Sequence, residues 1–328
     1  MRGTLLVLGR RLSCVALLSW AVLAAALPQG APVGGAGPPG QVPTIRVTSN
    51  LVTVPVSVTN ERGEPVRTLK AEDFRIDEDG QPQEVARVGE PGQTALELIL
   101  LFDISGSLNP RFDFQREAAS RFLRRILKPT DAVALLSIGT TPKMVAERTA
   151  NLSTALQALT QLAPTRQSTA FLDSVGTAAR ALRATANPEA RRVAITLSDG
   201  EDNNSEKDAI ADVLRELHHA DAIFYAVNPS GPSIWLNVTS LRGQKQLEKL
   251  AGETGGKVFL PDKIEELDAI FARIAAELEA QYLLGYYPTN QATDNSFRRI
   301  TVRVAARPDL SVRARQGYYA THGATASR

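Results

Sequence analysis

The sequence predicts an α/β fold: a doubly wound, mostly parallel sheet that is inserted in, or flanked by, a small β-sandwich. From Leu96 onward, unbroken apolar runs typical of strands buried on both faces alternate with amphipathic helical stretches. Before and after this region, apolar residues recur at every second position, which indicates strands with one buried face. The two flanks are short, so one shared sandwich is the simplest interpretation, and two separate β pieces packed on the sheet are the alternative.

The composition is that of an ordinary globular protein. The chain has 328 residues, of which 43% are hydrophobic and 22% charged, with a formal net charge of +2. This length allows one large domain and a smaller one. Basic residues form no sustained run, so no nucleic-acid partner is predicted. Cys14 is the only cysteine, which argues against a disulfide, a zinc–thiolate site and a cysteine nucleophile in the mature chain.

The first 26 residues are typical of a secretory signal peptide. Arg2, Arg10 and Arg11 precede an apolar stretch, Cys14–Ala26, that ends in small residues. This stretch is short for a spanning helix, which needs roughly 20 apolar residues. We therefore expect export through the secretory pathway to the periplasm or the exterior, with no membrane span in the mature chain; an uncleaved anchor is the alternative. Residues 27–43, rich in Gly and Pro, predict a flexible linker.

Residues 44–94 are predicted to form the first part of the sandwich. A half-buried strand is indicated by the alternating residues Val52, Val54, Val56 and Val58. Pro55 favours a place at a sheet edge or on its solvent side. A second strand, Phe74–Asp77, enters the turn Glu78–Gly80. The acidic residues Asp77 and Asp79 do not fit a calcium-binding loop. Such a loop needs glycine at its sixth position, whereas Gly80 is at the fourth position counted from Asp77.

Residues 95–281 are predicted to form the α/β domain. The expected buried strands are Leu96–Phe102, Val133–Ile138, Val193–Leu197, Ala222–Val227 and Lys257–Leu260. The expected helices are Gln115–Lys128, Ala170–Leu182, Lys207–His218, Gln244–Gly252 and Ile264–Gln281. Met144–Thr149 follows the second strand after a short turn, so it is expected to pair with it in antiparallel fashion. Alternation returns over residues 282–320, the second part of the sandwich, and residues 321–328 are predicted to be a disordered tail.

Polar residues follow two of the buried strands at the point where each strand ends. Asp103 closes the first run and Asp199 follows the third, so both carboxylates are expected at the same edge of the parallel sheet. Ser105 and Ser107 occupy alternate positions of a glycine-containing loop, and Thr169 begins a helix. Hydroxyls and carboxylates together suit a hard cation such as Mg²⁺. With neutral hydroxyls in the inner shell, the cation keeps enough positive charge to attract an acidic group from outside.

Together these residues resemble the metal-ion-dependent adhesion site of von Willebrand factor type A domains, over roughly residues 95–280. The positions that carry the resemblance are Asp103, Ser105, Ser107, Thr169 and Asp199. The resemblance implies a Rossmann-like fold that binds Mg²⁺ or Mn²⁺, with the carboxylate of a protein partner completing the coordination. In integrin β-type domains, acids after the second Ser hold another metal; Leu108-Asn109-Pro110 stands here instead, so no second adjacent ion is expected.

The flanks are similar to exported bacterial proteins described only as von Willebrand factor A-related, through Asn50–Val56 and Asp73–Gly80. Trp235 lies in a loop that is expected to be on the same face of the domain as the metal. There it is expected either to form a lip that binds the partner or to pack under the loop. Glu201 is a second candidate for partner binding, with a solvated loop charge as its alternative. Helix capping by the serines and a plain turn at Asp199 are the alternatives to metal ligation.

Catalysis is not predicted, and the expected function is that of an exported, metal-dependent binding or adhesion module. An aspartate-nucleophile hydrolase would place a second acid two residues after Asp103, where Ser105 stands. A serine hydrolase needs a histidine base, and the three histidines lie on a helix facing the opposite sheet edge or in the tail. The alternatives are a structural component of an envelope or secretion assembly that acts through its β domain and, less favoured, a metal-dependent hydrolase.

Overall fold

The apolar runs form one six-stranded sheet. The computed structural model describes residues 51–89, 91–105, 112–185, 187, 189–232, 237–305 and 307–321. The strand order is β10-β9-β8-β5-β6-β7, parallel throughout except for the antiparallel pair β6 and β7. The strands are β5 (Leu96–Asp103), β6 (Ala132–Ile138), β7 (Lys143–Thr149), β8 (Arg191–Leu197), β9 (Ala222–Val227) and β10 (Val258–Phe259). The α/β class and the antiparallel hairpin are confirmed.

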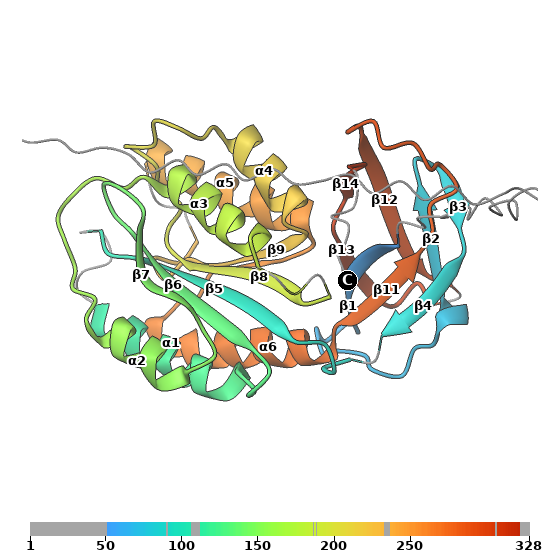
Figure 1. Cartoon of the computed structure of the whole chain (residues 1–328). Helices are drawn as coiled ribbons and strands as arrows, with labels where there is room; N and C mark the ends of the chain where they lie inside the picture. The colour runs from blue at the N-terminus through green and yellow to red at the C-terminus, as the bar shows by residue number, and fades with distance from the viewer. Residues whose placement is uncertain are drawn as a thin grey trace, which may run out of the picture. The chain divides into compact units, whose positions relative to one another are not determined.

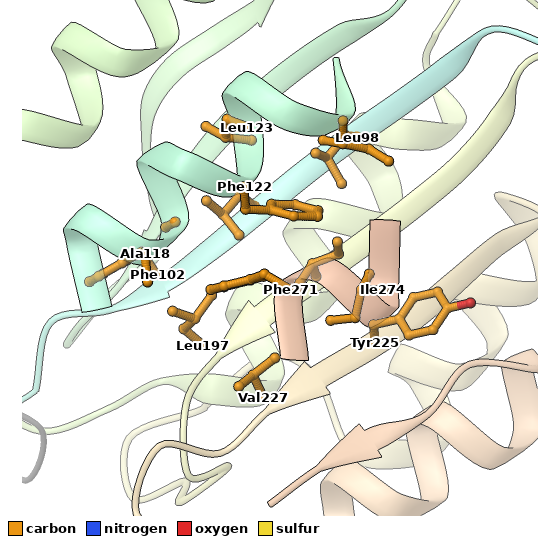
Figure 2. Packing of buried hydrophobic residues seen from close by; sticks show 14 of the residues in the cluster. Leu98, Phe102, Ala118, Phe122, Leu123, Leu197, Tyr225, Val227, Phe271 and Ile274 are labelled. Atoms are coloured by element: carbon orange, nitrogen blue, oxygen red, sulfur yellow. The ribbon is translucent and has the colours of Figure 1, made fainter. Parts of the chain in front are cut away.

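Helices cover both faces of this sheet (Figure 1). One face carries α1 (Phe112–Ile126), α2 (Leu152–Thr160) and α6 (Leu267–Ala280). The other carries α3 (Phe171–Arg183), α4 (Ile210–His219) and α5 (Val238–Thr254). Figure 2 shows α1 and α6 packing on the first face, where the rings of Phe122 and Phe271 stack with centroids 4.8 Å apart. Because helices cover both faces of the sheet, its strands carry apolar side chains on both sides.

The strand order reverses beside β5. The chain runs from β5 outward to β6 and β7, then returns to add β8 on the other side of β5. The carboxyl ends of β5 and β8 therefore flank the switch point, which is where doubly wound folds form their ligand crevice.

Strands from both flanks build the β-sandwich. Its two antiparallel sheets have the orders β13-β1-β11-β4 and β14-β12-β2-β3. The strands are β1 (Val52–Thr59), β2 (Phe74–Glu78), β3 (Gln81–Gln83), β4 (Val85–Gly89), β11 (Tyr282–Tyr286), β12 (Phe297–Val304), β13 (Ser311–Ala314) and β14 (Gly317–Tyr319). Short 3-10 helices are η1 (Ala71–Asp73) and η4 (Ile264–Glu266). Both sheets contribute to one core. The boundaries predicted between the α/β domain and the two parts of the sandwich remain predictions.

Pro55 does not lie where the sequence predicted. β1 is an inner strand of its sheet and Pro55 is buried, so the expectation of an edge or solvent-facing position is wrong. β13 pairs with β1 only from Val56 to Thr59. On the β13 side, the backbone at Pro55 thus has no partner strand. The missing N–H of proline therefore costs no hydrogen bond to β13.

The turn predicted at Glu78–Gly80 is confirmed at Asp79 and Gly80, which connect the antiparallel strands β2 and β3, whereas Glu78 is the last residue of β2. Asp79 and Gly80 both have positive φ, 48° and 80°, between β2 and β3. This is the conformation of the two-residue turns that match the twist of paired strands.

The described residues leave some predictions untested. The described residues, between 51 and 321, belong to one compact unit. The helices of the described part are all too short or too polar to cross a membrane. The predicted signal peptide, the linker, and residues 322–328 of the predicted tail lie outside the described residues.

An aromatic cluster joins α4 to strands β12 and β14. His218 is buried, with its ring centroid 5.1 Å from that of Phe297, and His219 stacks on Tyr319 at 4.7 Å. Burial, and next the positive charge of Arg315, lower the pKa of His218 from 6.5 to about 4. The junction therefore holds a neutral imidazole.

Stability should fall as the pH is lowered through this range. The unfolded chain takes up a proton on His218 near pH 6.5, whereas the folded protein resists it to about pH 4. The contribution is complete above pH 6.5 and is lost as pH falls, by about 3 kcal/mol between pH 7 and pH 4. Urea unfolding at both pH values, for the wild-type protein and His218→Gln, measures it. The variant should lose less stability on acidification; equal losses would contradict the assignment.

Candidate metal centre

The two predicted carboxylates lie at the ends of neighbouring strands. Phe102 of β5 pairs with Leu197 of β8, which brings Asp103 level with Ser198, one residue before Asp199. Asp103 is fully buried and Asp199 is only 6% exposed. Strand geometry alone thus brings two carboxylates together at the switch point, as the sequence predicted.

Asp103 is held by hydrogen bonds to both of its carboxylate oxygens. The Ser198 hydroxyl donates to Oδ2 at 2.6 Å, and the backbone N–H of Ser105 donates to Oδ1 at 2.8 Å. Burial, and next the charge of Asp199, raise the pKa of Asp103 from 3.8 to about 6, although these hydrogen bonds lower it. No Lys, Arg or His among the described residues forms an ion pair with Asp103. A divalent cation would offset the repulsion between the two carboxylates.

Thr169 reaches the same edge through contacts between loops. Its backbone N–H donates to Asn203 Oδ1 at 2.7 Å, and its carbonyl accepts the N–H groups of Asn203 and Asn204, each at 3.1 Å. The N–H of Thr165 donates to the carbonyl of Ile104 at 2.6 Å. The loops after β5, before α3 and after β8 are therefore hydrogen-bonded to one another.

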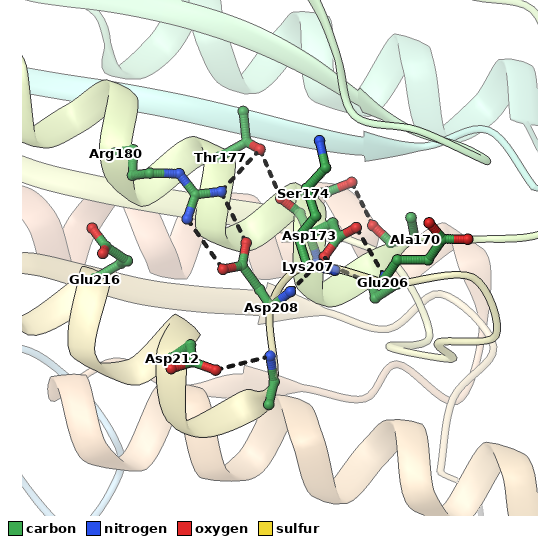
Figure 3. Close-up of polar contacts among 12 residues, drawn as sticks. Ala170, Asp173, Ser174, Thr177, Arg180, Glu206, Lys207, Asp208, Asp212 and Glu216 are labelled. Carbon is green, nitrogen blue, oxygen red and sulfur yellow. Dashed lines mark hydrogen bonds and ion pairs between the residues drawn. The ribbon is translucent and has the colours of Figure 1, made fainter.

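A second polar network anchors the loop after β8 to α3 (Figure 3). The buried carboxylate of Asp173 accepts the N–H groups of Glu206, Lys207 and Asp208 at 3.1, 3.0 and 2.8 Å. Asp208 in turn forms an ion pair with Arg180 at 2.8 Å. Sequence reasoning missed this network, and its one local signal is an acid in the first turn of α3. The network fixes the loop that carries Asp199 relative to the helix that follows Thr169.

Glycines let α5 approach the backbone beside Asp199. Gly200 has a φ of +75°, which favours glycine, and a Cβ there would lie 2.6 Å from Leu247 Cγ. A Cβ on Gly243 of α5 would lie 2.7 Å from the carbonyl oxygen of Asp199. Gln246 of the same helix donates to the carbonyl of Gly200 at 2.9 Å. Gly200 is thus needed for the close packing of α5 against this loop.

The acids that follow Asp199 have partners within the protein. Glu201 Oε1 accepts a hydrogen bond from the hydroxyl of Ser240, in the first turn of α5, at 2.5 Å. Asp202 Oδ1 accepts the N–H groups of Phe171 and Ser205, each at 3.2 Å. Asp202 therefore has a structural role, whereas partner binding by Glu201 remains a prediction.

Four of the five predicted ligand residues have described positions: Asp103, Ser105, Thr169 and Asp199. Ser107 and the candidate lip residue Trp235 lie outside the described residues. Within the described part, no group of three or more His, Cys, Asp or Glu side chains is placed to hold a metal ion. A cation here would therefore need hydroxyl ligands beside the two carboxylates. Such an all-oxygen set fits Mg²⁺ or Mn²⁺.

Comparison with known proteins gives a family match over this region. Residues 98–201 match the family model for the von Willebrand factor type A domain. No match was found among curated proteins. A solved structure of the conserved hypothetical protein BatB from Bacteroides thetaiotaomicron is similar, with 21% identity, a TM-score of 0.43, and coverage of 55% of this chain and 97% of that one.

Two further solved structures are similar. The von Willebrand factor domain of a type V pilus tip protein from Porphyromonas gingivalis has 12% identity and a TM-score of 0.45, covering 56% of this chain and 94% of its own. Proximal thread matrix protein 1 of the mussel byssus, with zinc in its MIDAS motif, has 16% identity and a TM-score of 0.47, covering 60% and 48%. The family match spans Asp103, Ser105, Thr169 and Asp199. The chain therefore contains a von Willebrand factor type A domain.

Proposed function

We propose that this protein is an exported, metal-dependent binding or adhesion module. Its cation, Mg²⁺ or Mn²⁺, would be held by Asp103, Ser105, Ser107, Thr169 and Asp199. The partner would be a protein that presents a carboxylate. The observation that carries this proposal is the pair of buried carboxylates, Asp103 and Asp199, at the end of adjacent parallel strands.

The chemistry of the donor set supports attraction of an acidic group. A bound divalent cation supplies a positive centre with coordination positions left for outside ligands. Hydroxyl ligands are neutral, so they leave more of the cation's charge than carboxylates do. The loops that carry the ligands are tied together through Thr169 and Asn203, which favours a preformed site.

Binding without catalysis is the function that the surrounding residues support. Ser105 stands two residues after Asp103, where an aspartate-nucleophile hydrolase needs a second acid. His218 packs on Phe297 at the junction of α4 with the sandwich, so it is not available as a base at the metal site. Export to the periplasm or the exterior rests on the signal-like first 26 residues.

Removing the charge of Asp103 should abolish metal-dependent partner binding. Immobilised protein is incubated with envelope extract in Mg²⁺ or in chelator, and retained proteins are quantified. Asp103→Asn, which preserves shape, should lower the Mg²⁺-dependent fraction at least about tenfold, as loss of even an outer partner of a metal does. Asp309→Asn, which alters an exposed carboxylate of the sandwich, is the matched control. Binding that survives both chelation and Asp103→Asn would assign the interface to the β-sandwich.

A further inference from the structure

A cavity separate from the metal centre lies beside the edge strand β10. It has a volume of about 640 Å³. Its walls come from the end of β1 and the turn that follows it, from β10, from α6 and from β13. Cavities of roughly 300–1,000 Å³ commonly hold small-molecule ligands. None of the proposed metal ligands that the structure describes, Asp103, Ser105, Thr169 and Asp199, lines it.

The cavity has more positive than negative charge. Its charged lining residues are Arg62, Lys257, Arg273, Arg313, Glu64 and Glu277. Four cations against two carboxylates leave a surplus of two positive charges. In a concave surface with low-dielectric walls, such a surplus focuses positive potential on the space inside.

The two carboxylates are already engaged within the protein. Glu277 forms an ion pair with Arg313 and accepts a hydrogen bond from the hydroxyl of Tyr225. Glu64 accepts a hydrogen bond from the Asn60 amide at 2.8 Å. Arg313 also donates to the carbonyl of Gly256 at 2.9 Å, which fixes its guanidinium against the wall. Glu277 is therefore neutralised by Arg313, whereas Glu64 keeps its charge and offsets one of the three remaining cations, which leaves the surplus of two positive charges.

Three cations are left without a carboxylate partner. Across the residues that the structure describes, no ion pair includes Arg62, Lys257 or Arg273. Lys257 lies over the ring of Phe259, with Nζ 5.3 Å from the centroid, so its charge stays beside an apolar wall of the cavity. These cations come from three separate elements: the turn after β1, the segment before β10, and α6. All three line one cavity, in which the positive charges exceed the negative charges by two.

We propose that this cavity binds a small molecule with two or more anionic groups, phosphate or carboxylate, held by Arg62, Lys257 and Arg273. Two anionic groups would balance the surplus of two positive charges. Hydrogen bonds between charged groups are also stronger than those between neutral groups. The site is independent of the proposed metal centre and of its partner.

Titration calorimetry of the full chain in metal-free buffer tests this proposal, with inorganic pyrophosphate and citrate as probes. Saturable binding of at least one probe is expected, and the ratio of the two affinities distinguishes phosphate from carboxylate recognition. Lys257→Ala and Arg273→Ala should each weaken binding about tenfold. Both side chains are exposed, so folding should be preserved. Arg124→Ala, on the exposed side of α1, should leave affinity unchanged, and raised salt should lower it.

Asp199→Ala separates this site from the metal centre, because it should bind the probe as tightly as the wild-type protein does. The proposal is overturned if neither probe binds saturably to the wild-type protein. It is also overturned if Lys257→Ala, Arg273→Ala and the wild-type protein bind with equal affinity.

Discussion

Gly243→Ala is expected to destabilise the protein by about 1–3 kcal/mol and to weaken Mg²⁺ binding, although Gly243 is not one of the proposed metal ligands. The added methyl would lie 2.7 Å from the Asp199 carbonyl oxygen and 2.8 Å from the Glu201 nitrogen. Both are backbone atoms, so the loop or the helix must shift. Because Asp199 is in that loop, its carboxylate moves with it. The helix propensity of alanine, about 1 kcal/mol better than glycine, acts in the opposite direction.

Gly252→Ala is the matched control for this prediction. It lies in the same helix, and a Cβ there would meet nothing within 4 Å. This variant should gain up to about 1 kcal/mol and bind Mg²⁺ unchanged. Urea unfolding and a calorimetric Mg²⁺ titration of both variants measure the two effects. Equal behaviour of the two variants would show that the close approach of α5 does not position Asp199.

Glu78→Gln is expected to lower the free energy of unfolding by about 3–5 kcal/mol, because it leaves a buried guanidinium without its counter-charge. Glu78 and Arg298 form an ion pair at 3.3 Å inside the sandwich, with 2% of each side chain exposed. The hydroxyls of Tyr286 and Tyr318 donate to the same carboxylate at 2.7 and 2.9 Å. Burial, followed by the contact with Glu78, raises the pKa of Tyr318 to about 12, so this phenol remains a donor.

Two further variants test the cause of that loss. Asp77→Asn alters the preceding residue of β2, whose partner Arg303 is 67% exposed although Asp77 itself is 18% exposed, so the loss should be about 1 kcal/mol and smaller than that of Glu78→Gln. The double variant Glu78→Gln/Arg298→Met removes both charges and should lose less stability than Glu78→Gln alone. Urea denaturation of all three variants gives the comparison. A double variant less stable than Glu78→Gln would show that the unpaired charge is not the cause.

The meeting of Asp103 and Asp199 could be predicted because it depends on geometry that all parallel sheets share. An apolar run shows where a strand ends, and parallel strands end at one edge. The contacts that fix the site could not be predicted in this way. Asn203 and Asp173 bind backbone N–H groups of segments more than 30 residues away in sequence, and such pairings leave no periodic pattern.

Other misses have different causes. The helix α2 did carry a signal: Asn151 caps it, and Leu156 and Leu159 have helical spacing. Pro55 was misplaced because a sequence cannot show that β13 covers only part of β1. Local capping rules would have found the helix, whereas the position of Pro55 depends on how far a distant strand extends.

Titration of the wild-type protein and Asp199→Ala with Mg²⁺ and Mn²⁺ is the most direct test of the metal centre. Calorimetric heats and the thermal unfolding midpoint are the measurements. At a metal concentration one hundred times Kd, wild-type stability should rise by about 2.7 kcal/mol, a shift of several degrees. Asp199→Ala should show neither heat nor shift. A wild-type protein that responds to neither metal, or an Asp199→Ala variant that responds equally, would contradict the account.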